Sequence, residues 1–297
     1  DFYSLGIPNL FAVSAEHRNG IGDLLDHVTT GFARQEETVD QPEKLVIKVA
    51  IIGRPNVGKS TLLNALVGTE RAIVSPIAGT TRDAVDETIS RPEADYVFVD
   101  TAGIRRKGKT YLMAEKLSVV MARRHIRMAN VVLMVLDSSE GLVALDATIA
   151  GYAQEEGRAI ILCVNKWDVT KEKDKKEFTQ QVRDQLKFLD YAPVVMLSAK
   201  TGSGVTKLFP VIRQAWDAAS QRITTGELNR FLDQLKLERD RRIFFITQPS
   251  IRPPTFVLFM DRAEPLHFST ERQFINRIRK HFGFDGTPIV LKVKARH

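Results

Sequence analysis

A strand, a glycine-rich loop and a helix follow one another over residues 49–67, and this stretch constrains the fold most. The loop G-R-P-N-V-G-K-S matches the pattern G-x-x-x-x-G-K-[ST]. Gly53 and Gly58 let backbone N–H groups turn toward a phosphate at the N-terminus of the following helix. Lys59 is expected to reach the β- and γ-phosphates of a nucleoside triphosphate, and the Ser60 hydroxyl to bind Mg²⁺. The alternative is a chance glycine turn before a helix.

Apolar segments alternate with amphipathic segments of helical period between residues 45 and 220. Such alternation predicts an α/β fold in which a mainly parallel sheet carries helices on both faces. Ligands of such sheets bind beyond the carboxyl ends of the strands. We expect strands over 46–52, 96–100, 131–137, 159–165 and 194–198, and helices near 61–67, 112–127, 146–156, 175–189 and 205–219.

An aspartate and a glycine follow the second of these strands, in Asp100-Thr101-Ala102-Gly103. A carboxylate at a strand tip can hold Mg²⁺, usually through water, and Gly103 can present its N–H group to a γ-phosphate. The pattern D-x-x-G alone mostly marks a turn. Downstream of a phosphate loop, it indicates the second element of a nucleotide site.

Two later strand ends indicate a guanine pocket. In Asn165-Lys166-Trp167-Asp168 the aspartate can accept hydrogen bonds from N1 and the 2-amino group of guanine, a donor pair that adenine lacks. Asn165 can bond the base edge and tie loops together, while the Lys166 stem packs on the ring. The segment 198–200 would complete the pocket with a backbone N–H near the guanine oxygen. Three unrelated loop ends, the alternative, do not explain this order at successive strand tips. The expected nucleotide-binding residues are Gly53, Arg54, Pro55, Asn56, Val57, Gly58, Lys59, Ser60, Thr61, Asp100, Thr101, Ala102, Gly103, Ile104, Asn165, Lys166, Trp167, Asp168, Ser198, Ala199 and Lys200.

The net charge of +7 belongs entirely to the C-terminal part of the chain. Residues 1–220 contain 28 Lys and Arg against 28 Asp and Glu, whereas residues 221–297 contain 15 against 8. A basic module beside a neutral body favours a polyanionic partner such as RNA or DNA, although a merely solvated basic surface is the alternative. No apolar run is long enough for a membrane span, and the single cysteine, Cys163, lies in an apolar run. A reducing cytoplasm is therefore expected.

The first 34 residues repeat a later part of the chain. Ser14 matches Ser198 at an offset of 184 residues, and the same offset pairs Leu24 with Leu208. Only the last strand and helix of a nucleotide-binding unit are represented, and such a pair has no sheet of its own to join. We therefore expect residues 1–34 to be the end of an upstream domain of the same kind.

Together these motifs resemble the translation-factor class of GTPases over residues 46–219. Four segments are similar to the EngA/Der family: G-R-P-N-V-G-K-S, A-G-T-T-R-D at 78–83, D-T-A-G-I-R-R-K-G-K at 100–109, and N-K-W-D. The resemblance covers essentially the whole chain. It implies two Era-like GTPase domains in tandem, then a KH-like domain, and a role in assembly of the large ribosomal subunit. The expected division is a GTPase-domain remnant over 1–34, a linker over 35–44, an Era-like P-loop GTPase domain over 45–220 and a small basic α+β KH-like domain over 221–297.

The resemblance also implies the cations and catalytic residues. Thr81, with Thr80 beside it, would bind Mg²⁺ and sense the γ-phosphate, and Ser60 and Asp100 would share that ion. The implied catalytic residues are Lys59, Thr81, Gly103 and Asn56.

A potassium site is implied at Asn56, as in potassium-dependent relatives, with backbone oxygens near Ser75 and Ile77. Such a cation can replace an arginine finger, because it stabilises charge developing between the β- and γ-phosphates. Asn56 could instead be a turn residue that tolerates a left-handed conformation.

Ile104 follows Gly103 where many GTPases carry a water-orienting glutamine. An isoleucine cannot orient water by hydrogen bonding, so we expect slow hydrolysis unless a partner or another residue completes the site. The basic run 105–109 would be a mobile switch that orders on GTP or RNA, or simply a solvated loop.

The segment 221–297 is expected to fold in the order α-β-β-α-β, as in a KH-like domain. Helices are expected over 228–237 and around 274–282, closed by Gly283, and strands over 243–247, 256–260 and 289–293. The usual KH clamp on four nucleotides, made by a G-x-x-G loop, is not assumed. Four aromatic side chains are expected in the core rather than as base-stacking platforms: Phe244, Phe245, Phe256 and Phe259.

The leading hypothesis is a monomeric GTP-hydrolysing switch whose nucleotide state rearranges the basic module on ribosomal RNA. A second is a non-catalytic RNA-binding adaptor whose fold is stabilised by guanine nucleotide. In a third, the basic module only docks within the chain.

Overall fold

The computed structural model describes residues 44–68, 86–105, 111–170, 174–235 and 242–295, together with isolated positions between residues 11 and 28. The chain divides into two compact units, Asp1–Lys44 and Leu45–His297. The expected repeat over 1–34 and the linker over 35–44 therefore lie largely outside the described residues.

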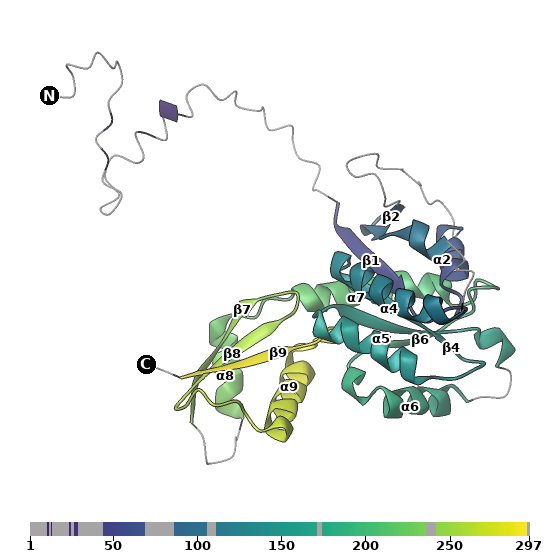
Figure 1. Cartoon of the computed structure of the whole chain (residues 1–297). Coiled ribbons are helices and arrows are strands. Elements are labelled where there is room, and N and C mark those ends of the chain that lie inside the picture. The colour runs from purple at the N-terminus through teal and green to yellow at the C-terminus, as the bar shows by residue number, and fades with distance from the viewer. Residues whose placement is uncertain are drawn as a thin grey trace. The chain divides into compact units, whose positions relative to one another are not determined.

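A six-stranded sheet forms the larger part of this unit, in the order β2-β3-β1-β4-β5-β6 (Figure 1). Its strands are β1 (Val46–Ile52), β2 (Glu87–Arg91), β3 (Ala94–Phe98), β4 (Val131–Asp137), β5 (Ala159–Asn165) and β6 (Val194–Met196). All pairs are parallel except β2 with β3. The expected mainly parallel sheet is confirmed.

Helices cover both faces of this sheet because alternate strand residues face opposite sides. One side of the sheet packs against α2 (Lys59–Val67) and α7 (Leu208–Ser220). The other packs against α4 (Tyr111–Met128), α5 (Ala144–Glu155) and α6 (Lys175–Gln185). Every residue of β4 and β5 is buried, as is usual for central parallel strands. Cys163 is a free, buried thiol in β5.

Three local expectations need correction. The strand expected over 96–100 lies at Ala94–Phe98, and the one expected over 194–198 ends at Met196. The edge strand β2 is absent from the expected set, because its sequence E-T-I-S-R carries polar residues instead of an apolar run.

A second, three-stranded sheet lies in the C-terminal part, in the order β7 (Ile243–Ser250), β8 (Thr255–Met260), β9 (Val290–Ala295). One face packs against α8 (Thr225–Gln234) and α9 (Phe268–Phe282). The order α-β-β-α-β is as expected, and α9 ends at Gly283, whose φ of 78° is left-handed. Thr224 and Glu227 form a capping box at the N-terminus of α8. The helix therefore begins at Thr225, before the expected residue 228.

The aromatic residues of this sheet divide between its two faces. Phe256 is fully buried in the core, as expected. Phe245 and Phe259 are instead half-buried and stack on each other away from that core, with ring centroids 4.2 Å apart and planes 13° from parallel.

The part of the chain from α8 to β9, which we call the C-terminal layer, docks at the amino ends of β5 and β6. Ile160 N–H donates to the Gly286 carbonyl at 2.8 Å, and Gly286 N–H donates to the Tyr191 carbonyl at 2.9 Å. The Arg252 guanidinium lies over the Trp216 ring, 4.5 Å from its centroid. The opposite end of the sheet, where the expected nucleotide motifs lie, is left free of these contacts. No helix among the described residues is long and apolar enough to cross a membrane.

Candidate nucleotide-binding site

The loop between β1 and α2 has the conformation that a phosphate cradle requires. Gly53, Asn56 and Gly58 all have positive φ, at 143°, 66° and 99°. A side chain at Gly53 would place Cβ 2.6 Å from the Val135 carbonyl oxygen, and one at Gly58 would meet the Asn165 amide nitrogen at 2.3 Å. Glycine is therefore required at both positions for space as well as for backbone angle.

Lys59 folds back over this loop. Its ammonium group donates to the carbonyl oxygens of Gly53 at 2.8 Å and Arg54 at 2.7 Å. Burial lowers the pKa of Lys59 from 10.5 to about 8, partly offset by the charge of Asp146. A partly desolvated cation held among carbonyls is suited to an incoming polyphosphate, which would supply the missing negative charge.

Arg54 anchors the loop to the start of α5. Its guanidinium pairs with Glu140 and lies 3.3 Å from the carboxylate of Asp146, which is fully buried. Asp146 also accepts the Val143 N–H at 3.1 Å, at the first turn of α5. Burial raises the pKa of Asp146, against the lowering effects of the Val143 N–H and Arg54. The Arg54 side chain is thus held in place by Glu140 and Asp146.

Asn165 joins the phosphate loop to the guanine segment. Its amide nitrogen donates to the Val57 carbonyl at 2.8 Å, and its amide oxygen accepts the Ala199 N–H at 2.9 Å. The side chain is only 2% exposed, so both bonds are shielded from water. The expectation that Asn165 ties loops together agrees with these contacts.

Lys166 pairs with a carboxylate that sequence reasoning did not include. Its ammonium group lies 2.6 Å from the buried Asp137 carboxylate at the end of β4. Burial alone would raise the pKa of Asp137, but hydrogen bonds from Lys166 and Ser139 bring it below its usual value. Lys166 has a left-handed φ of 61°, and Asp168 follows it in a short 3₁₀ turn, partly exposed.

The segment after β6 is a compact loop beside Asn165. Ser198 is buried and accepts the Thr201 N–H at 3.2 Å through its hydroxyl oxygen, while Ala199 is 5% exposed and Lys200 is exposed. The Trp167 N–H donates to the Leu197 carbonyl at 3.2 Å. The two expected guanine segments are therefore brought together.

Asp100 follows β3 by two residues and has a left-handed φ of 49°. Its carboxylate is 2.8 Å from Nε2 of His125 on α4, and its N–H donates to the Asp86 carboxylate at 2.8 Å. The following residues form a short helix, α3 (Thr101–Arg105).

Ile104, within α3, packs against the apolar core on the α2 side of the sheet. This position therefore supplies no polar group, as the sequence predicted. Thr80, Thr81, Ser75, Ile77 and residues 106–110 lie outside the described residues.

The comparisons with known proteins agree with this geometry. Residues 48–166 match a family described as 50S ribosome-binding GTPase, and residues 222–294 match the KH-domain-like of EngA bacterial GTPase enzymes, C-terminal. GTPase Der of Bacillus cereus (strain G9842) is 48% identical over 306 residues, covering 100% of this chain and 70% of that protein. The chain belongs to the GTPase Der family.

A second relative, GTPase Der of Staphylococcus carnosus (strain TM300), is 45% identical over 308 residues with the same coverage. A solved structure of an Era variant from Aquifex aeolicus, bound to GDP and AlF4⁻, covers 84% of this chain and 93% of its own at 25% identity, with a TM-score of 0.43. Der-family membership rests on the sequence relatives. It confirms a P-loop GTPase fold with a KH-like C-terminal part.

As a Der-family protein the chain is a GTP-hydrolysing enzyme that binds GTP and GDP, and Mg²⁺ is the usual companion of that substrate. The hypothesis of a non-catalytic adaptor is therefore set aside.

Four side chains of this Der-family site were missed from the sequence: Asp137, Glu140, Asp146 and His125. Asp137 offered a signal, because it is a carboxylate at the end of a buried strand, where the other motifs also lie. Glu140 and Asp146 precede or begin a helix and carry no spacing that links them to Arg54. His125 is a buried residue of α4, and its position in the sequence gives no reason to pair it with Asp100.

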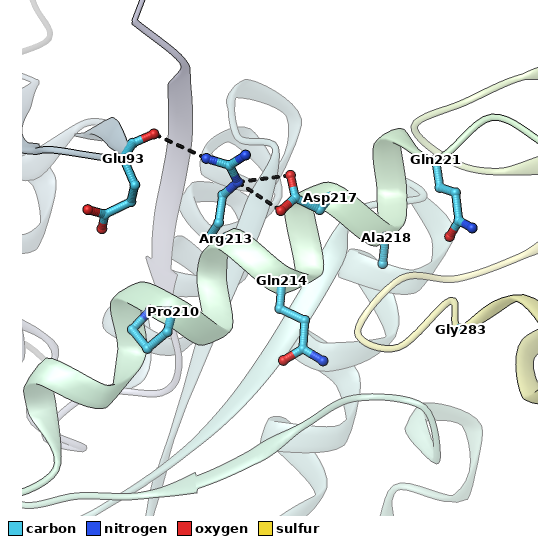
Figure 2. A pocket seen from close by; sticks show the side chains of 8 residues that line it. All are labelled: Glu93, Pro210, Arg213, Gln214, Asp217, Ala218, Gln221 and Gly283. Carbon is cyan, nitrogen blue, oxygen red and sulfur yellow. Dashed lines mark hydrogen bonds and ion pairs between the residues drawn. The ribbon is translucent and has the colours of Figure 1, made fainter.

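Two cavities lie away from the phosphate loop. One of them, of about 690 Å³, lies beside α7. Figure 2 shows its lining residues, among which Arg213 donates to the Glu93 carbonyl and to the Asp217 carboxylate. The other, of about 580 Å³, lies between α7 and α9 and is lined by both basic and acidic groups, including Arg279 and Asp190. Since these charges are mixed and partly paired, neither cavity competes with the phosphate loop as the nucleotide site.

Proposed function

We propose that this chain is a nucleotide-dependent switch that acts in assembly of the large ribosomal subunit, with ribosomal RNA as the partner of its basic C-terminal part. The observation that carries the proposal is the Asn165 bridge. It couples the loop that would hold the phosphates to the loop that would hold the guanine, so both sense one nucleotide. The description 50S ribosome-binding GTPase and the charge of residues 221–297 support the choice of partner.

The nucleotide roles follow the strand-end geometry. The backbone from Gly53 to Ser60 surrounds the phosphates, and Lys59 exchanges its two carbonyl contacts for phosphate oxygens. Asp168 accepts from the guanine base, while the segment 198–200 supplies a backbone N–H near the guanine oxygen. We assign the remaining expected contacts, Pro55, Thr61, Thr101, Ala102 and Lys200, to the same nucleotide.

The donor set suits Mg²⁺. Ser60 offers a hydroxyl oxygen in the first turn of α2, and Asp100 a carboxylate oxygen; both are the hard oxygen ligands that Mg²⁺ prefers. Among the described residues, no group of three or more His, Cys, Asp and Glu forms a separate metal site. The ion would be held mainly by the nucleotide phosphates, with Thr81 as a further ligand. When bound, Mg²⁺ neutralises charge on the β- and γ-phosphates.

Potassium is proposed as a second cation. Asn56 is exposed at the tip of the phosphate loop with a left-handed backbone, where its amide oxygen is available to a cation beside the phosphates. A turn role for Asn56 is compatible with the same backbone, so turnover must decide between them.

Hydrolysis transfers the γ-phosphoryl group to water and leaves GDP. Ile104 gives no hydrogen bond to that water, because its side chain packs against the core. Charge stabilisation by Lys59, the Gly103 N–H and a cation at Asn56 would therefore carry the reaction, with a partner completing the site.

The proposed organisation is the one expected from the sequence: a GTPase-domain remnant over 1–34, a linker over 35–44, an Era-like domain over 45–220 and a KH-like domain over 221–297. A monomer in the cytoplasm is part of the same proposal.

Cosedimentation with purified 50S subunits tests the switch. We expect association in one nucleotide state, GTP analogue or GDP, to exceed the other by at least about fivefold, a coupling of about 1 kcal/mol. GTP turnover measured in parallel should be at least about tenfold faster in K⁺ than in Na⁺, and Asn56→Ala should remove that difference. Equal sedimentation in both states contradicts the switch, and equal turnover in both salts contradicts the potassium site.

A further inference from the structure

One face of the three-stranded sheet is turned away from its helices. Strand residues alternate between faces, and Ile246, Phe256, Leu258 and Met260 point into the core with α8 and α9. The opposite positions form what we call the outer sheet face: Phe245, Thr247, Val257, Phe259, Lys292 and Lys294.

The strand register places these six side chains in two rows across the sheet. Phe245 pairs with Phe259, and Phe259 pairs with Lys294. Two residues along, Thr247 pairs with Val257, and Val257 with Lys292. The first row therefore contains two aromatic rings and the ammonium group of Lys294. The second row ends in Lys292, which lies on the same edge strand, β9.

The aromatic pair is preformed. The two rings are 4.2 Å apart and 13° from parallel, so each covers one side of the other, and both remain half-buried instead of entering the core. Two ordered rings lose little side-chain entropy when a third planar group joins them.

The charge of the outer sheet face has a single sign. Lys292 and Lys294 are both exposed, and the strands I-F-F-I-T-Q-P-S, T-F-V-L-F-M and V-L-K-V-K-A contain no acidic residue. Arg242, at the start of β7, lies over the Phe244 ring with its guanidinium carbon 5.2 Å from the centroid. A protein partner would need a complementary acidic, aromatic-binding surface, whereas nucleic acid offers phosphates and planar bases in every residue.

The docking contacts of the C-terminal layer use other residues. Arg252 and Pro253 lie in the β7–β8 turn, and Gly286 precedes β9. Docking on the six-stranded sheet therefore does not engage the aromatic row.

We propose that the outer sheet face binds single-stranded RNA, with an unpaired base stacked on the Phe245–Phe259 pair and phosphates beside Lys292 and Lys294. Duplex RNA is excluded from this contact because its bases are already stacked within the helix. The proposal rests on the proposed function in taking RNA as the partner. It supplies a contact surface apart from the G-x-x-G match at residues 283–286, where Gly286 is hydrogen-bonded to Ile160 and Tyr191.

Fluorescence anisotropy of the full chain with a labelled octauridylate tests the contact. We expect Phe259→Leu to weaken binding about tenfold or more, since leucine keeps the apolar volume but offers no ring for stacking. Lys292→Gln with Lys294→Gln should reduce the slope of log affinity against log salt by about 1.4, at about 0.7 for each single-strand phosphate contact. A duplex of equal length should compete poorly.

Matched variants control for general effects. Phe268 is 74% exposed on α9, and Phe268→Leu should leave affinity unchanged. Lys175 and Lys176 are exposed on α6, and their double Gln variant removes the same charge without lowering the slope as far. Equal affinity for Phe259→Leu and wild type overturns the proposal, as does equal competition by duplex RNA or an absence of octauridylate binding. If the wild-type chain binds octauridylate as expected but does not cosediment with 50S subunits, the proposed function fails while the RNA contact stands. The two failures are therefore distinguishable.

Discussion

At the scale of single residues, the site is held by side chains that cross between segments. Asn165 reaches the phosphate loop and the Ala199 amide, Lys166 reaches Asp137, and Arg54 reaches Asp146. Lys59 is the exception, since it contacts only backbone carbonyls of its own loop. It is the group whose charge the site stabilises least without nucleotide.

Lys59 should make GTP affinity depend on pH. With a pKa of about 8 in the free protein, Lys59 loses its proton between pH 7 and 9. Bound phosphates favour the charged form and raise that pKa, so binding takes up a proton in this range. We expect GTP affinity to fall about tenfold from pH 7 to pH 9, measured by titration calorimetry. Lys175→Met should keep the same profile, whereas a flat profile in the wild type would contradict the lowered pKa.

At the scale of elements, the phosphate loop packs closely against the segment that contains Asn165. This close packing is possible because Gly58 has no side chain. A methyl group there would lie 2.3 Å from the Asn165 amide nitrogen. Because that nitrogen bonds the Val57 carbonyl, a displaced Asn165 would also lose its contact with Ala199.

We therefore expect Gly58→Ala to lower the free energy of unfolding by about 2–4 kcal/mol, combining left-handed strain with two lost buried hydrogen bonds. GTP affinity should fall at least about tenfold. Gly283 is the matched control, since its φ is 78° and no atom lies within 4 Å of the place that a methyl group would take. Gly283→Ala should cost about 1 kcal/mol and leave GTP affinity unchanged. Similar losses in both variants, by urea unfolding and nucleotide titration, would show that strain alone acts.

The same scale shows what sequence could predict. Buried parallel strands such as β4 and β5 are continuous apolar runs, and the nucleotide motifs follow strands directly, so both are predictable. The edge strand β2 is not, because its polar residues give no apolar run, although Glu87 and Thr88 are buried. Contacts made by Asp146 and His125 depend on tertiary packing across many residues, which local spacing does not encode. The sequence favours the core for Phe259 because an aromatic residue in a strand usually lies there, and only the register shows which face it occupies.

At the scale of the whole second unit, nucleotide binding and docking use opposite ends of the same strands. The motifs follow the carboxyl ends of β1, β3, β5 and β6, whereas Gly286 and Arg252 contact the amino-end side of β5 and the end of α7. Damage to the dock should therefore leave the nucleotide site intact.

Gly286→Val tests this separation. A Cβ at Gly286 would lie 3.0 Å from the Ala215 Cβ and 3.4 Å from Pro193, so the dock must open. We expect the thermal melt to split, with the C-terminal layer unfolding first, while GTP affinity stays within about twofold. Gly141 has the same φ of 77° with nothing within 4 Å, and Gly141→Val should show a single transition. A single, equally shifted transition in both variants would contradict an independent dock.

The dock also has a direction along the chain. The docking residues of the nucleotide-binding part are Gly157, Ile160, Tyr191 and Trp216. All four precede in the chain the residues that contact them, Arg252, Pro253 and Gly286. A ribosome synthesising this chain completes the receiving surface before the gripping residues leave the exit tunnel. Domains generally fold as units from the N-terminus during synthesis. The C-terminal layer thus emerges after the domain that it docks on has folded. Its docking covers Tyr191 and Trp216, two aromatic side chains that the nascent chain would otherwise expose and that could promote aggregation.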